Sequence, residues 1–86
     1  MNRKITFMSD PSHGWISVPR KDLELLEIID KISEFSYQKG NRVYLEEDSD
    51  APLYIKEAEN RGWVLNIKES HTNKRHWIRY TQNFQK

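Results

Sequence analysis

The chain has 86 residues, of which 36% are hydrophobic and 31% charged, with a formal net charge of +1. A chain this short supports one core, and three Trp, four Tyr and three Phe supply apolar bulk that a disordered chain lacks. The absence of cysteine excludes disulfides, thiol catalysis and cysteine-ligated zinc. No apolar run approaches the roughly 20 residues of a membrane helix, and residues 1–8 do not resemble a signal peptide. We therefore expect a soluble, intracellular protein.

The first third of the chain predicts a hairpin followed by a helix. Residues 4–8 alternate between polar and apolar side chains, residues 9–14 are turn formers, and residues 15–18 form a second β-favouring run. After Pro19 the spacing of Leu23, Leu26 and Ile29 changes to a helical period. This spacing predicts an amphipathic helix of about two to three turns.

The middle of the chain repeats this order. Residues 35–37 and 42–45 flank a turn at 39–41 and predict a second hairpin, and residues 51–61 predict a second helix. Ser49 or Asp50 is expected to cap this helix, with Pro52 in its first turn and Gly62 at its end. Residues 63–67 then predict a fifth strand.

The resulting order ββαββαβ predicts an α+β fold. We expect a small, mainly antiparallel sheet of about five strands, with both helices on one face. This domain would span residues 1–67. Residues 68–86 would form a basic, aromatic C-terminal tail or an extension of the same domain.

The distribution of charge singles out the last twenty residues. Residues 67–86 contain five basic residues and one acidic residue, whereas residues 1–66 contain nine basic and twelve acidic residues. A positive segment that also carries aromatic rings suits an anionic partner. The candidate contacts to nucleic acid or another anion are Lys74, Arg75, Trp77, Arg79 and Tyr80.

Two geometries of this segment would serve an anion. On a helix, Arg75 and Arg79 would share a face and clamp a phosphate, while Trp77 or Tyr80 stacks on a base. On a strand, Arg75, Trp77 and Arg79 would share a face. Under the alternative interpretation, the apolar residues pack back onto the domain and the cations stay solvated; these apolar residues are Trp77, Ile78, Tyr80 and Phe84.

A second candidate site lies in the loop of the first hairpin. Asp10 and His13 could hold a water or a metal, with the carboxylate orienting the imidazole. The alternative is an Asx turn in which Asp10 binds backbone amides, Gly14 has a positive φ and Trp15 enters the core. His13 has no evident purpose in such a turn.

The acidic run Glu46, Glu47, Asp48 and Asp50 has two interpretations. Clustered carboxylates could bind a hard cation, but the run lacks the register and glycine of an EF-hand loop. The favoured interpretation is stabilisation of a helix N-terminus, worth about 0.3–1 kcal/mol for each acid. A secondary site would arise if Asp10, His13, Asp48 and His71 converged.

Several of these segments resemble one group of proteins. The run from Ser9 to Trp15, with Val18-Pro19, Ser36-Tyr37 and the run from Tyr44 to Asp50, is similar to small uncharacterised proteins encoded by bacteriophages and prophages. The resemblance covers nearly the whole chain, although Ser12 stands where glycine is expected. It implies a phage accessory protein that acts in the cytoplasm of a bacterial host, but it does not point to any particular reaction.

Together these observations lead us to expect a non-enzymatic binding protein without a cofactor or bound metal. Its basic C-terminal segment would contact nucleic acid or a nucleotide. One alternative is an inhibitor of a host protein that acts through the acidic face. Another is a small hydrolytic or metal-assisted enzyme that uses Asp10, His13 and the acids from Glu46 to Asp50. Short exposed sheet edges also suggest a homodimer.

Overall fold

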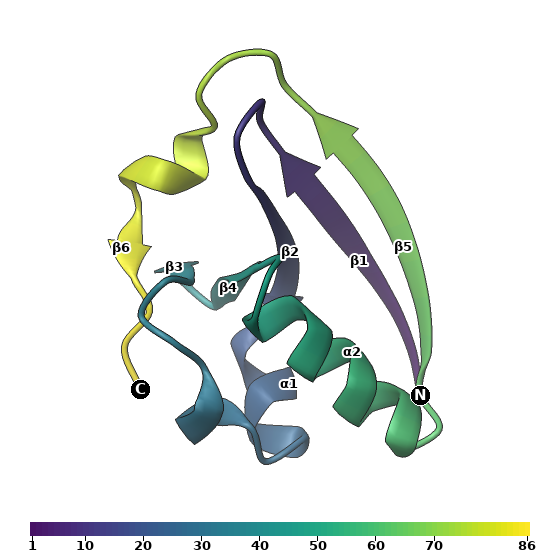
Figure 1. Ribbon diagram of the computed structural model, residues 1–86. Helices are drawn as coiled ribbons and strands as arrows, with labels where there is room; N and C mark the ends of the chain where they lie inside the picture. The colour runs from purple at the N-terminus through teal and green to yellow at the C-terminus, as the bar shows by residue number, and fades with distance from the viewer.

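One sheet, covered by helices on one face, organises the molecule (Figure 1). The computed structural model describes residues 1–86. Its strands are β1 Asn2–Ser9, β2 Gly14–Pro19, β3 Tyr37–Lys39, β4 Arg42–Glu46, β5 Val64–His71 and β6 Gln82–Asn83. Its α-helices are α1 Arg20–Leu25 and α2 Asp50–Asn60, and two short 3-10 helices are η1 Ile29–Lys31 and η2 Trp77–Tyr80. The predicted α+β class is confirmed, with six strands in place of about five.

The strand order across the sheet is β5-β1-β2-β4-β3-β6. Only β1 and β5 pair in parallel, and all other neighbours are antiparallel. The two edges are therefore β5, which is long, and β6, which has two residues. The sequence did not predict β6 because two polar residues carry no detectable β pattern.

Strand alternation divides the apolar side chains between two faces. The helix face carries Ile5, Ile16, Val18, Val43 and Leu45, and these residues share one core with α1 and α2. The helices contribute Leu23 and Leu26 from the first segment and Ala51, Tyr54 and Ala58 from the second. The prediction that both helices lie on one face is confirmed.

The opposite face is covered in part by the end of the chain. Trp15 and Tyr44 point to this face and form a second, smaller core with Ile78 of η2. Residues 68–71 continue β5, and β6 then pairs with β3, so residues 68–86 belong to the same sheet and core. Figure 1 shows the C-terminal segment passing from the end of β5 over η2 to the β3 side.

The first predicted helix is interrupted. It ends at Leu25, and Glu27 takes a positive φ of 58°. The Ile28 N–H donates to the Leu23 carbonyl and the Glu27 N–H donates to the Glu24 carbonyl, which together form a Schellman motif. Glycine usually marks this motif. Because glutamate occupies the position here, the helical spacing alone suggested a longer helix.

The second helix lies close to its prediction but begins differently. Neither Ser49 nor Asp50 caps it through a side chain. The buried Asp50 carboxylate instead accepts hydrogen bonds from the Ser33 and Ser36 hydroxyls and tethers the segment before β3. Gly62 follows the helix with a φ of +77°. No helix in the structure has the length and apolar character needed to cross a membrane.

Gly14 is required for space and not for a positive φ, so that part of the Asx-turn interpretation is wrong. A Cβ on Gly14 would lie 2.4 Å from Cζ of Phe7 and 2.8 Å from Oε2 of Glu47. We predict that Gly14→Ala lowers the free energy of unfolding by about 1–3 kcal/mol because the Phe7 ring must move. Urea denaturation measures this change.

A Phe7→Leu background provides the control for this prediction. Leucine lacks the outer ring atoms that the new methyl group would meet, so the cost of Gly14→Ala should be smaller there than in the parent chain. An equal cost in both backgrounds would contradict the steric explanation.

Candidate functional site

Asp10 is the centre of the loop between β1 and β2. Its Oδ1 accepts hydrogen bonds from the backbone N–H groups of Ser12 and His13, both at 3.0 Å. These bonds confirm the predicted Asx turn, and Trp15 enters the core as expected, with 2% of its surface exposed. The other oxygen, Oδ2, accepts from the His76 N–H at 3.0 Å. The loop therefore holds a segment 66 residues further along the chain.

Arg79 of η2 completes the coordination of the Asp10 carboxylate. Its Nε lies 2.6 Å from Oδ2 and its Nη2 lies 2.8 Å from Oδ1, a two-pronged ion pair. The guanidinium holds the pKa of the Asp10 carboxyl far below its usual range, and the three backbone N–H groups act in the same direction. The charge of Arg79 is thus largely neutralised within the protein.

This ion pair corrects the predicted role of Arg79. Arg75 and Arg79 lie on neither a common helix nor a common strand, because η2 begins at Trp77 and the residues before it are irregular. Arg79 anchors the C-terminal segment with a side chain that is 14% exposed, while Arg75 is exposed. The two guanidinium groups do not form the expected clamp.

His76 is the N-cap residue of η2. Its Nδ1 accepts a hydrogen bond from the Ile78 N–H, which caps the 3-10 helix. Burial lowers the pKa of His76, so the neutral imidazole that this acceptor role needs is favoured. His76 therefore positions Ile78 in the second core and Arg79 beside Asp10.

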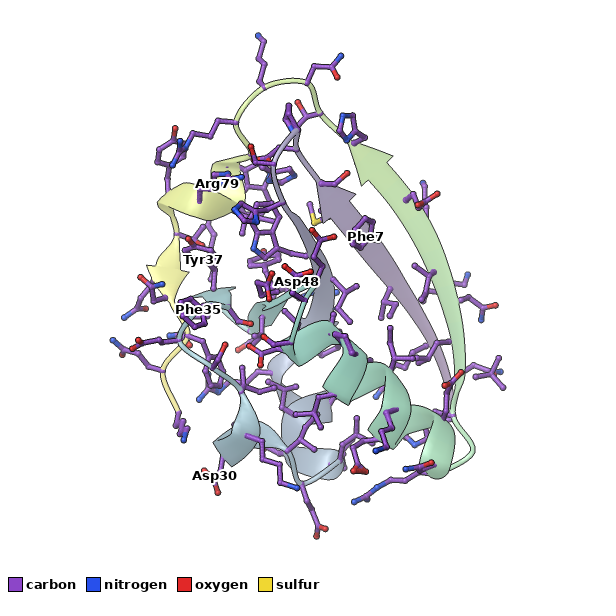
Figure 2. The ribbon with its side chains drawn as sticks, viewed as in Figure 1. Phe7, Asp30, Phe35, Tyr37, Asp48 and Arg79 are labelled. Atoms are coloured by element: carbon purple, nitrogen blue, oxygen red, sulfur yellow. The ribbon has the colours of Figure 1, made fainter.

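A pocket opens between η2, the β1–β2 loop and β3. It has a volume of about 290 Å³. We call it the aromatic pocket, and it is lined by His13, Trp15, Phe35, Tyr37, Glu46 and Arg79. Figure 2 shows Arg79, Tyr37 and Phe35 following one another down the side of the molecule that carries η2 and β3.

The walls of the aromatic pocket combine rings with unused polar atoms. Trp15 and Tyr37 meet edge to face with centroids 6.3 Å apart, and the Arg79 guanidinium lies 5.3 Å from the Trp15 centroid. Arg79 bonds Asp10 through Nε and Nη2, which leaves Nη1 as a donor. Glu46 uses Oε2 to accept from the Asp48 N–H and the Ser49 hydroxyl, which leaves Oε1 as an acceptor.

A second hollow also borders Arg79. It has a volume of about 200 Å³ and is lined by Asp10, Pro11, Ser12, Arg75 and Arg79. We call it the basic hollow. Arg79 lines both hollows, so its side chain lies between a ring-lined space and a space bordered by the exposed Arg75 guanidinium.

Exposed rings and cations flank the two hollows. Phe35 is 70% exposed, Tyr80 72% and Trp77 46%. The Arg75 guanidinium lies 5.8 Å from the Tyr80 centroid, and Lys39 Nζ lies 5.5 Å from the Trp77 ring. Lys74 is also exposed. By contrast, Ile78 and Phe84 are buried, so these two residues pack back onto the domain as the alternative interpretation expects. Trp77 does so in part, since its ring meets Tyr44 edge to face with centroids 5.3 Å apart.

The four residues of the secondary site do not converge. Asp10 bonds Arg79, Asp48 is exposed in the turn before α2, and His71 Nδ1 lies 2.8 Å from the Ser9 hydroxyl across β1 and β5. No group of three or more His, Asp or Glu side chains is placed to hold a metal ion. His13 alone lines the aromatic pocket, where it lies near Glu46 of the acidic run.

The sequence did not single out Phe35, Tyr37 and Glu46 as members of one site. One signal was present, since Phe35 and Tyr37 are two residues apart and would share a face of an extended chain. Their approach to Trp15 and Arg79 depends on the pairing of β3 with β4 and on the return of the C-terminal segment. No protein-family model matches this chain, and no curated protein or solved structure does.

Proposed function

We propose that the protein is a non-enzymatic module that binds single-stranded nucleic acid, or a single nucleotide, through the aromatic pocket and its C-terminal segment. The observation that carries this proposal is the shared wall at Arg79, which separates a ring-lined pocket from a hollow bordered by a second arginine. Nucleic acid alternates flat apolar bases with anionic phosphates. The two hollows offer these two chemistries side by side.

The aromatic pocket suits a base. Its volume of about 290 Å³ accepts one base with part of its sugar, and the exposed Phe35 ring and the half-buried Tyr37 ring provide ring surface. Stacking of a base on an aromatic side chain contributes about 1–3 kcal/mol with little sequence preference. The free oxygen of Glu46 and Nη1 of Arg79 supply an acceptor and a donor for the edge of the base.

The basic hollow suits the adjoining phosphate. The exposed Arg75 guanidinium borders it together with Ser12, and Lys74 adds a cation from the same segment. Tyr80, which lies beneath Arg75, offers a surface for the next base. Phosphate contacts of this kind supply affinity without reading sequence.

The chemistry of Asp10 supports binding in place of catalysis. Both of its oxygens accept hydrogen bonds, and its depressed pKa makes it a poor proton acceptor. The resemblance to phage and prophage proteins supports a role as an accessory protein in the cytoplasm of a bacterial host.

We predict salt-dependent binding of a labelled single-stranded oligonucleotide, such as oligo-dT of about ten nucleotides, a length within the usual site sizes. Tyr80→Ala should weaken binding about fivefold or more through loss of stacking. Arg75→Ala should also weaken it and should reduce the slope of log K against log salt by about one. Fluorescence anisotropy measures both quantities.

Two exposed residues on the helix side provide matched controls. Lys56→Ala removes one cation from α2, and Leu25→Ala removes a half-exposed apolar side chain from α1. Neither change should alter affinity. An affinity that does not respond to salt, or equal losses for Arg75→Ala and Lys56→Ala, would refute the proposed surface.

A further inference from the structure

The free edge of β5 is a long strand that lacks a neighbour on one side. Its pairing with β1 runs without a bulge from Asn2↔Val64 to Ser9↔His71. At the two ends of this ladder, the Val64 N–H donates to the Met1 carbonyl and the Thr72 N–H donates to the Ser9 carbonyl. Even-numbered residues therefore direct their backbone groups to β1. Leu65, Ile67 and Glu69 direct theirs outward.

This edge has few of the features that usually prevent strand pairing. It contains no proline, and its only cation is Lys68. Val64 is 55% exposed and Ile67 is 47% exposed. The other edge, β6, has two residues and offers little backbone for pairing. β5 is therefore the edge at which a further strand can add.

We propose that a second copy of this chain occupies the edge, with β5 pairing antiparallel to its symmetry mate and the two-fold axis passing between the two Ile67 residues. This register places each outward-facing backbone group opposite another one. Ile67 then faces Ile67 of the second copy, and Leu65 faces Glu69 in both directions. Two six-stranded sheets join into one continuous sheet.

Two criteria favour this register over the alternatives, namely the charges that face each other across the axis and the position of the axis along β5. With Ile67 on the axis, Lys68 faces Asn66 and no like charges are opposed. An axis at Lys68 or at Glu69 would oppose two ammonium groups or two carboxylates, which destabilises an antiparallel pair. An axis at Asn66 opposes no like charges but shifts the pairing away from the middle of the strand. The strand is thus self-complementary about Ile67.

The apolar surface next to β5 also favours pairing at this edge. On the helix face, Ile67 and Glu69 border a groove of about 550 Å³ beside α2. The groove is otherwise lined mainly by apolar side chains, namely Phe7, Ile16, Ala51, Pro52 and Ile55, together with Glu47. The Ile67 side chain of the second copy would lie next to this groove, so the pairing extends an apolar surface that already exists.

The absence of cysteine makes a crosslinking experiment direct. Paired residues on the axis have Cα atoms about 5.5 Å apart, within the range for a disulfide. We expect the Ile67→Cys variant to form a disulfide dimer roughly tenfold faster than Asn60→Cys, an exposed control at the end of α2, because pairing raises the effective thiol concentration. Non-reducing electrophoresis during mild oxidation gives the rates.

Analytical ultracentrifugation of the unmodified chain provides a second, independent test of the dimer. We expect a monomer–dimer equilibrium that Ile67→Lys shifts to monomer, because two ammonium groups then meet at the axis, while the circular dichroism spectrum stays unchanged. Equal crosslinking rates for the two cysteine variants would overturn the proposal. So would a wild-type chain that stays monomeric at high concentration, or a dimer that Ile67→Lys leaves intact, since another partner or surface must then be involved.

Discussion

Replacement of Asp10 with alanine is expected to detach the C-terminal segment from the sheet. The substitution removes the acceptor of two Arg79 hydrogen bonds and of the His76 N–H, and it leaves a guanidinium that is 14% exposed without its partner. Loss of one member of a buried ion pair costs about 3 kcal/mol or more. This is a large fraction of the roughly 5–15 kcal/mol that stabilises a domain.

The effect should be seen in two measurements. Urea denaturation should give a lower free energy of unfolding for Asp10→Ala than for the parent chain. The fluorescence of Trp15 and Trp77 should also change under native conditions, because both rings contact His76. Asp30→Ala is the matched control, since Asp30 is an exposed carboxylate on η1, and Figure 2 shows it at the opposite end of the molecule from Arg79, the partner of Asp10.

The same ion pair predicts a pH dependence. The folded-state pKa of Asp10 is depressed, so its stabilising contribution is complete above the unfolded-state pKa of about 3.9 and is lost as the pH falls towards the folded value. Between pH 7 and pH 2 the parent chain should therefore lose more stability than Asp10→Asn, which cannot ionise. If Asp10→Ala and Asp30→Ala had the same stability, the anchoring role would be wrong.

The sequence predicted those parts of the fold that depend on local periodicity. Alternation located β1 and β2, and the spacing of apolar residues placed both helices on one face. The break at Glu27 was not predicted because a glutamate with positive φ has no sequence signature. β6 was missed because its pairing with β3 depends on the anchored path of the C-terminal segment.

For the candidate site, the sequence predicted residue types and their exposure, but it did not predict which side chains pair within the protein. Exposure of Arg75 and Tyr80 agrees with a contact role. The expected phosphate clamp of Arg75 and Arg79 was wrong because charge patterning does not reveal that Asp10, 69 residues away, pairs with Arg79. Phe35 and Tyr37 joined the site only through tertiary contacts. Local sequence patterns thus predict a basic, aromatic segment. Contacts between residues far apart in the chain determine which of its cations are paired within the protein and which are available to a ligand.

Asp22 is expected to be the other acid on which folding depends. Its side chain is fully buried and accepts hydrogen bonds from Nε and Nη2 of Arg3, at 2.9 and 2.8 Å, and from the Tyr54 hydroxyl at 2.8 Å. These partners lie on β1 and α2, while Asp22 itself lies on α1. One carboxylate therefore ties together three elements of the main core.

We predict that Asp22→Ala lowers the free energy of unfolding by about 3–5 kcal/mol, because it leaves the Arg3 cation and the buried Tyr54 hydroxyl without their acceptor. Thermal and urea denaturation measure the loss. Glu24→Ala tests whether any acid of α1 would have this effect, since Glu24 is exposed on the same helix and should change stability by no more than about 0.5 kcal/mol.

A double substitution separates lost packing from the unpaired charge. If the cost arises from the stranded cation, Arg3→Leu in the Asp22→Leu background should recover part of the stability, because an apolar pair of similar volume replaces the ion pair. Tyr54→Phe in the same background should recover a further part, since it removes the hydroxyl that lost its acceptor. If neither second substitution restored stability, the loss would have to come from altered packing around α1, and the electrostatic explanation would be wrong.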